Sequence, residues 1–327
     1  MKRRHLIQST AVSAIAVFAG EVLAQGPWPD RPIVWVSVSA PGGNSDVVSR
    51  VITQKLAERL KATVVVENKP GASGGIASAH VAKAAPDGYT LLAGSVASHA
   101  IYPLIGKVAF DPVRDFVPVM VLGTNANVLV VPVDSPYRTV QDVLVAARAN
   151  PGSVAYGSPG IGSTQHMSGE LLQKLAGVKL THVPNVRGSV ITDVMAGHIP
   201  MTFDGPSLLP HVTGGRLRAL AVTSKKRLPQ LPDVPTMEEA GVSGFEVSSW
   251  QALYAPAGTP KNMVDKLNQE VAAVLTMPEV VARYQQMGLT TAPMTPAEFA
   301  AFQRAEIAKW SAVVKDARPQ VGVGSPL

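Results

Sequence analysis

Short apolar runs alternate along the chain with segments in which apolar residues recur at helical spacing. The first apolar run covers residues 33–36, and the first helical pattern covers 47–60. Ser37–Asp46 lies between them and contains two adjacent glycines, Gly42 and Gly43. This order predicts a strand, a glycine-containing turn and a helix.

The same order recurs through most of the chain and predicts an α/β fold. Short links between strands and helices favour mostly parallel, doubly wound sheets, arranged as two similar lobes with a cleft between them. The last helix carries large apolar residues along one face and is expected to pack into the core. Beyond the first unit, strands are predicted at 63–66, 89–93, 117–122, 128–131, 154–157, 180–183, 201–203, 217–222 and 247–254, and helices at 76–84, 140–147, 167–175, 190–196, 208–212, 260–275, 279–287 and 296–317.

Three turns at predicted strand ends are rich in Ser, Gly and Asn and contain no Lys or Arg: Ser37–Asp46, Gly94–His99 and Ser158–His166. Ligands of open α/β sheets bind at these ends of the strands. A helix that begins in such a turn points unpaired backbone N–H groups and its positive dipole end at the turn, which suits a carboxylate. An ordinary helix start with nothing bound is the alternative at Ser37–Asp46.

The N-terminus has the pattern of an export signal. Residues 1–5 are basic, 6–23 are mostly apolar, and Val22 and Ala24 supply the small residues read by a signal peptidase. A signal peptide is therefore predicted over 1–24, with cleavage after Ala24 and a soluble periplasmic product. Arg3-Arg4 leaves twin-arginine export open beside the ordinary route.

Composition narrows the function classes. The 327 residues are 46% hydrophobic and contain no Cys, which excludes disulfides, thiolate metal sites and a Cys nucleophile. The net charge of +6 falls to +4 without the leader, which carries three basic residues and one acidic residue. Scattered basic residues and only 5% aromatic residues argue against nucleic acid as a partner.

Catalytic and cofactor motifs are incomplete. Tyr156–Gly160 resembles a nucleophile elbow, but Tyr156 replaces its first glycine and Pro159 removes an oxyanion-hole N–H. Gly160 and Gly162 begin a dinucleotide fingerprint whose last glycine is replaced by Gln165. The histidines lack metal-ligand spacing, so neither a metal nor a cofactor is expected.

Two residues near the predicted cleft have alternative roles. His166 either belongs to the helix start or contacts a ligand. Asp204 follows a short predicted strand and either caps the next helix or accepts a hydrogen bond from a ligand.

Sequence blocks in order along nearly the whole mature chain resemble the Bug proteins, the substrate-binding components of tripartite tricarboxylate transporters. These blocks are Trp28–Ile33, Pro41–Asp46, Val65–Ala72, Ala85–Thr90, Phe110–Phe116, Leu217–Thr223, Leu231–Thr236 and Ala255–Pro260. The resemblance implies a two-lobe periplasmic-binding-protein fold, type II-like, that closes on a small carboxylate. It places lobe 1 at 25–123 and 248–327 and lobe 2 at 124–247.

The resemblance also nominates ligand-binding residues in the turns and near the cleft. Asn185 and Arg187 replace a Tyr and a Lys that are usual in the family, and Arg187 either pairs with a second carboxylate or is solvated. Ala40 and Pro159 also depart from the family pattern. The nominated residues are Ala40, Gly42, Gly43, Asn44, Asp46, Ser98, Ser158, Gly162, Ser163, Thr164, His166, Asn185, Arg187 and Asp204.

The function predicted from these observations is capture of a small organic acid by a monomeric, non-enzymatic receptor. Membrane subunits of a tripartite transporter are the expected partners. The alternative is a periplasmic module that signals to a membrane sensor protein. An enzyme on this scaffold would need a catalytic constellation that the sequence lacks.

Overall fold

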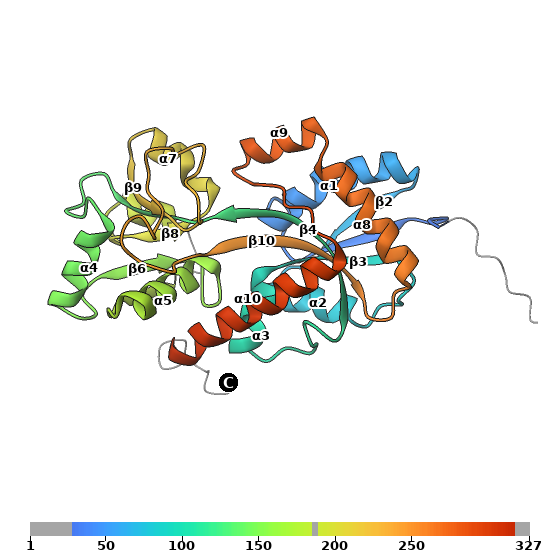
Figure 1. The fold of residues 1–327 in the computed structure, drawn as a ribbon, viewed down its shortest axis with the longest axis horizontal. Helices are drawn as coiled ribbons and strands as arrows, with labels where there is room; N and C mark the ends of the chain where they lie inside the picture. Colours follow the sequence, from blue (N-terminus) through green and yellow to red (C-terminus); the bar gives the residue numbers. More distant parts are fainter. Residues whose placement is uncertain (1–27, 185–188, 318–327) are drawn as a thin grey trace, which may run out of the picture.

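The computed structural model describes residues 28–184 and 189–317 and contains two five-stranded sheets (Figure 1). The predicted leader, Asn185 and Arg187 lie outside the described residues. We call the first sheet with its helices the first lobe and the second sheet with its helices the second lobe. This arrangement confirms the two-lobe α/β architecture expected from the sequence.

The first sheet has the strand order β2-β1-β3-β10-β4. β1 pairs in parallel with β2 and β3, whereas β10 is antiparallel to both β3 and β4. Its strands are β1 Ile33–Ser37, β2 Val64–Asn68, β3 Thr90–Ser95, β4 Phe116–Ala126 and β10 Ser248–Pro256.

The second sheet has the order β7-β6-β8-β5-β9. β6 is parallel to β7 and β8, and β5 is antiparallel to β8 and β9. Its strands are β5 Val128–Pro132, β6 Ala155–Ser158, β7 Thr181–Pro184, β8 Thr202–Asp204 and β9 Leu217–Val222.

Both sheets are mostly parallel, as expected: in each of them four strands run in one direction and a single strand, β10 or β5, runs against them. The reversed strand follows from the path of the chain between the lobes. β1, β3, β6 and β8 run toward the region between the lobes, but β5 and β10 start there and run away from it. A strand that starts at this edge must be antiparallel to neighbours that end at it.

The predicted lobe boundaries fall within β4 and at the start of β10, so extended strands connect the lobes. Only Asn127 separates β4 from β5. The lobe limits themselves stay a prediction.

Helices cover both sheets, and short 3₁₀ turns at Ala72–Gly74 and Pro206–Leu208 and a π-helical turn at Ala97–Ile101 complete the described elements. The helices are α1 Asn44–Leu60, α2 Gly75–Val81, α3 Tyr102–Ile105, α4 Val140–Ala149, α5 Thr164–Ala176, α6 Val190–Met195, α7 Leu209–Thr213, α8 Lys261–Leu275, α9 Pro278–Gln286 and α10 Pro296–Ala317. Among the helices of the described ranges, none is long and apolar enough to cross a membrane.

α10 packs into the core, as predicted, and contacts both lobes. It lies along β4 and β10 and extends toward α5 (Figure 1). Phe299 and Trp310 are fully buried in a cluster that contains side chains of both lobes. Near the end of α10, Lys174 of α5 donates to the Ala312 carbonyl (3.0 Å) and pairs with Asp316 (2.8 Å).

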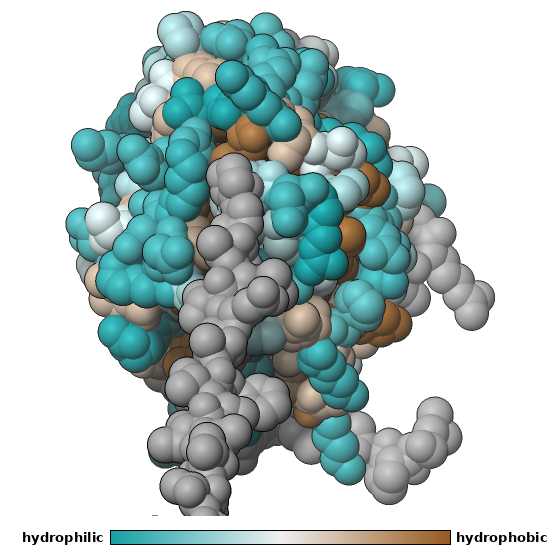
Figure 2. Space-filling model, turned by 90° about the vertical axis from the view of Figure 1, so that its right-hand side faces the viewer, coloured by the Kyte–Doolittle hydropathy of each residue, from teal (hydrophilic) through white to brown (hydrophobic). Residues whose placement is uncertain are grey.

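The remaining core is divided between the lobes. Trp35, Leu56 and Leu267 belong to an apolar cluster of the first lobe, and Val130 and Val194 belong to one of the second. On the face shown in Figure 2, hydrophilic residues predominate and hydrophobic ones are scattered. This division into cores follows the two sheets.

Candidate ligand-binding site

A cavity of about 330 Å³ lies between the two lobes. The start of α1 and the strands β4 and β10 line it from the first lobe, and the start of α5 and the end of β8 line it from the second. Its lining residues are Gly42, Asn44, Val47, Asn125, Asn127, Thr164, Gln165, Asp204, Gly205, Pro206, Ser207, Ser249 and Met287.

The start of α1, where Asn44 lines this cavity, has backbone N–H groups without hydrogen-bond partners among the described residues. The Asp46 N–H donates to Ser39 Oγ (3.0 Å), and the Val47 N–H donates to the Gly43 carbonyl (2.9 Å). The N–H groups of Asn44 and Ser45 make no hydrogen bond within the described ranges. The first turn of a helix leaves such groups without an intrahelical partner.

Two glycines shape this turn in different ways. Gly42 has φ +79°, a conformation that favours glycine, and a Cβ there would meet nothing within 4 Å. A Cβ on Gly43 would come within 2.9 Å of Ser39 Cβ and 3.0 Å of the Ala40 carbonyl oxygen. Gly42 therefore sets the backbone conformation, and Gly43 permits the close packing of the loop.

The side chain of Asp46 stabilises the turn through hydrogen bonds to its backbone and to neighbouring elements. Its carboxylate accepts hydrogen bonds from the Gly42 N–H (2.9 Å) and Asn68 Nδ2 (2.8 Å) and pairs with Arg50 (2.9 Å). Burial acts to raise the pKa of Asp46, but the bonds from Arg50, Gly42 and Asn68 outweigh it and lower this pKa from 3.8 to about 2. The carboxylate is thus occupied by the loop and does not line the cavity.

The start of α5, like that of α1, combines a serine hydroxyl that accepts from a backbone N–H with two backbone N–H groups that have no partner within residues 28–184 and 189–317. Ser163 caps the helix, because its Oγ accepts from the His166 N–H (3.2 Å) and donates to the Gly160 carbonyl (2.7 Å). The N–H groups of Thr164 and Gln165 have no hydrogen-bond partner in the part of the chain that the structure describes. Two helix starts, one from each lobe, therefore face one cavity.

His166 lies behind the second turn. It is fully buried, and its Nδ1 accepts from the Gly162 N–H (3.3 Å). Burial, with a smaller contribution from His182 at a ring distance of 4.1 Å, lowers the pKa of His166 to about 3. A neutral ring at physiological pH supports the turn and does not line the cavity.

The hydroxyl groups of Ser158 and Ser98 form hydrogen bonds with neighbouring protein groups and do not line the cavity. Ser158 Oγ lies 2.6 Å from His182 Nε2. Ser98 Oγ donates to the Ser95 carbonyl (3.1 Å) and lies 2.9 Å from Nδ1 of His99. The turn that contains Ser98 contributes no lining residue to the cavity.

Asp204 lines the cavity from the end of β8. Its Oδ1 accepts from Gln165 Nε2 (3.1 Å) and from the Gly205 N–H (2.7 Å). Burial raises the pKa of Asp204, and these two hydrogen bonds act in the opposite direction. The bond to Gln165 joins β8 to the start of α5.

Sequence reasoning predicted four of the thirteen lining residues and missed the others, among them Asn125 and Asn127. Both are buried, and the Oδ1 atom of each has no hydrogen-bond partner in the described residues. The available signal was two Asn residues around one Ala directly after an apolar strand, where the chain was expected to cross between lobes.

The predicted ligand-binding residues divide into two groups in the structure. Gly42, Asn44, Thr164 and Asp204 line the cavity. The others within the described residues lie in the surrounding loops, where their contact with a ligand stays a prediction: Ala40, Gly43, Asp46, Ser98, Ser158, Gly162, Ser163 and His166. Residues 28–184 and 189–317 contain no group of three His, Asp or Glu side chains placed to hold a metal ion.

Comparison with known proteins identifies relatives over nearly the whole chain. Residues 48–318 match the family model for the tripartite tricarboxylate transporter family receptor, TctC. A UPF0065 protein of the tcbD-tcbE intergenic region of Pseudomonas sp. strain P51 is 40% identical over 93% of this chain and 92% of its own length. BugT of Bordetella pertussis is 33% identical over 88% of this chain and 90% of its own length.

Solved structures of similar proteins have the same fold. R. palustris Rpa4515 with adipate has a TM-score of 0.79 at 37% identity, covering 89% of this chain and 98% of its own. MatC of Rhodopseudomonas palustris with bound malate has a TM-score of 0.77 at 32% identity, covering 88% and 100%. The periplasmic binding protein BugD has a TM-score of 0.76 at 32% identity, covering 89% and 99%. The predicted resemblance is confirmed, and the chain belongs to the TctC family of tripartite tricarboxylate transporter receptors.

Proposed function

We propose that this protein is a periplasmic receptor that captures a small organic carboxylate in the cavity between its lobes. The observation that carries the proposal is the pair of helix starts, α1 and α5, whose free N–H groups face the same cavity from opposite lobes. Membrane subunits of a tripartite transporter are the proposed recipients of the ligand.

Helix starts suit a carboxylate on physical grounds. Their free N–H groups donate to the carboxylate oxygens, and the helix dipoles favour the negative charge. No Lys or Arg of the described residues lines the cavity, so these donors would replace a cation. Relatives whose structures hold adipate and malate support the same ligand class.

Ligand binding would also favour a closed arrangement of the lobes. A carboxylate held by both helix starts contacts both lobes, so it binds more tightly to the arrangement in which the lobes are close. The connecting strands β4 and β10 are the segments about which the lobes would move. We expect capture and release without turnover of the ligand.

A thermal-shift assay tests the capture step. Mature protein, residues 25–327, is heated with adipate, with malate and with the corresponding neutral diamides. A ligand that binds the native state alone raises the melting temperature, so at least one carboxylate should raise it and the neutral diamides should not. A shift with the diamides and none with any carboxylate would show that the anion argument is wrong.

Export and delivery need separate measurements. N-terminal sequencing of the periplasmic protein should begin at Gln25. Deletion of the protein should abolish uptake of the carboxylate that it binds. Normal uptake with a lost transcriptional response to the ligand would contradict transport and favour a role in signalling.

A further inference from the structure

We infer that the ligand carries a hydrogen-bond donor, a hydroxyl or amino group, in addition to its carboxylate. The inference rests on the proposed function and narrows its substrate class to hydroxy or amino carboxylates. It comes from three residues that we call the acceptor wall: Asn125, Asn127 and Asp204, all of which line the cavity.

The orientation of Asn127 is determined by its neighbour. Ser168 Oγ donates its proton to the Thr164 carbonyl (2.8 Å), so it can only accept from Asn127 Nδ2 (3.2 Å). The amide oxygen of Asn127 is then directed elsewhere, and it has no partner in the described part of the chain. Asn127 is only 1% exposed, so this acceptor is buried.

Asn125 adds a second acceptor. Its Nδ2 lies 3.4 Å from the Ala126 carbonyl oxygen, whereas its Oδ1 is buried and unpaired within the described residues. The Asn125 side chain lies against Gly205, where a Cβ would come within 3.3 Å of Nδ2. Gly205 directly follows Asp204, so Asn125 and the end of β8 are neighbours.

Asp204 supplies the third acceptor. It is paired with Val128 across β5 and β8, which places it beside the strand that begins just after Asn127. Its Oδ1 already accepts two hydrogen bonds, and no bond to its Oδ2 is formed within the described ranges. Burial without a cation raises the pKa of Asp204, which agrees with a need for a donor at this position.

The two sides of the cavity therefore differ in chemistry. The helix starts present donors, which suit carboxylate oxygens, whereas the residues of the acceptor wall bring oxygens that lack donors in the described ranges to the other side. Buried acceptors require a donor from whatever fills the cavity. A ligand methylene would displace water and leave them unpaired, whereas a hydroxyl or amino group would satisfy them.

Matched ligand pairs test this inference by calorimetric titration. The pairs are succinate and malate, glutarate and 2-hydroxyglutarate, and adipate and 2-aminoadipate. In the pair whose length fits best, the donor-bearing member should bind at least tenfold more tightly, because a site built for a ligand hydrogen bond discriminates against an analogue that lacks it.

Variants of the acceptor wall test whether its residues cause the tighter binding of the donor-bearing ligand. Asp204→Asn keeps the shape of the side chain but replaces an acceptor oxygen by a donor, and it should reduce the preference by at least threefold. Asn125→Leu is the second variant, and it provides the measurement if the first does not fold. Asn44→Ala, on the opposite side of the cavity, should change both affinities of a pair by the same factor.

Each outcome has a distinct meaning. Equal affinity within every bound pair overturns the inference and leaves the carboxylate receptor intact. An unchanged preference in Asp204→Asn or Asn125→Leu overturns the role of the acceptor wall. Failure of every carboxylate to bind overturns the proposed function and this inference with it.

Discussion

The Asp46 carboxylate shows how a site residue can act without touching the cavity. It binds the Gly42 N–H, Arg50 and Asn68, which belong to the loop, to α1 and to β2. Through Gly42 it determines the position of the loop beside the free N–H of Asn44. Asp46 is therefore a positioning residue in the structure.

Replacement of Asp46 by Asn should lower both stability and ligand affinity, because Asn has one acceptor oxygen and no charge and so cannot keep the bonds from Gly42, Arg50 and Asn68 together. The folded pKa of about 2 lies below the ordinary 3.8, so the carboxylate stabilises the fold above about pH 4 and loses this effect as the pH falls through 2. Urea unfolding of wild type and Asp46→Asn should differ at pH 7 and converge toward pH 2. A difference that is independent of pH would contradict this role.

Sequence patterns predicted the turns that line the cavity, but they did not predict the lining residues Asn125 and Asn127. Gly42, Asn44 and Thr164 lie in the turns that follow predicted strands, so their place near strand ends was predictable from periodicity. The orientation of Asn127 depends on Ser168 and Thr164, which lie on α5, far along the chain. Contacts between distant segments leave no local sequence pattern.

At the scale of elements, α4 and α5 begin with the same kind of cap in different places. Thr139 and Asp142 form a capping box at α4, where Thr139 Oγ1 accepts from the Asp142 N–H (3.2 Å). Ser163 caps α5 beside the cavity. Loss of either cap should affect helix stability, but only the cap of α5 lies where its loss could also affect ligand binding.

Ser163→Ala and Thr139→Ala should each reduce stability by about 1 kcal/mol, because each removes an N-cap acceptor. Ser163→Ala should also weaken ligand binding, since the same hydroxyl bonds to Gly160 and shapes the turn. Chemical unfolding and titration of both variants provide the comparison. Equal ligand affinity in the two variants would contradict the role of the α5 start.

The order of strands and helices and the mostly parallel sheets were predictable, but the single reversed strand of each sheet was not. Each element has its own periodicity, which local sequence records. The direction of β5 and β10 depends on where the chain crosses between lobes, and this is a property of the whole path. The expectation of mostly parallel sheets is confirmed, and only the reversed strands β5 and β10 could not be assigned from local patterns.

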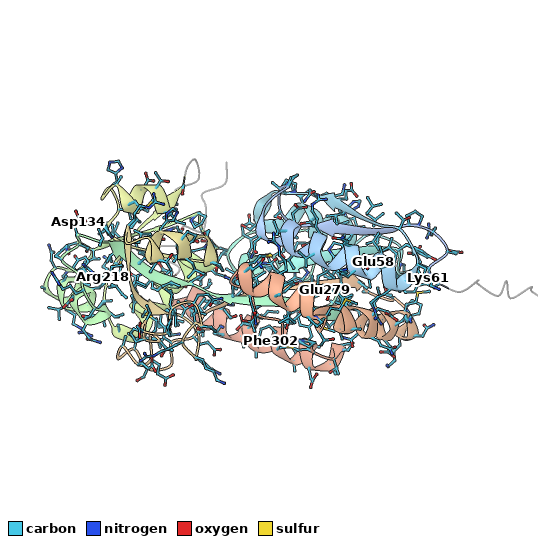
Figure 3. The ribbon with its side chains drawn as sticks, turned by 90° about the horizontal axis from the view of Figure 1, so that it is seen from above. Glu58, Lys61, Asp134, Arg218, Glu279 and Phe302 are labelled. Atoms are coloured by element: carbon cyan, nitrogen blue, oxygen red, sulfur yellow. The ribbon has the colours of Figure 1, made fainter. Side chains whose placement is uncertain are left out.

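At the scale of the whole molecule, we expect the two lobes to move relative to one another about the connecting strands β4 and β10. Figure 3 shows Asp134 in the second lobe and Glu58 in the first, toward opposite ends of the long axis. Both side chains are exposed, and the chain has no Cys. Two introduced cysteines can therefore be labelled without competing thiols.

Fluorescence energy transfer between labels at Glu58→Cys and Asp134→Cys should increase when the bound carboxylate is added, because the ligand favours closed lobes. The change should saturate at the same concentration as binding measured by calorimetry. Labels at Glu58→Cys and Arg114→Cys, both in the first lobe, should report no change. Saturable binding without any change between the lobes would contradict closure.

The central position of β10 in the first sheet affects the order in which the two sheets can form during synthesis. β10 is made more than a hundred residues after β3 and β4, yet it lies between them in the first sheet. The second sheet needs only β5 to β9, which form one continuous stretch of the chain. A chain emerging N-terminus first can complete the second sheet early, while the first remains open at its centre until residues 248–256 arrive.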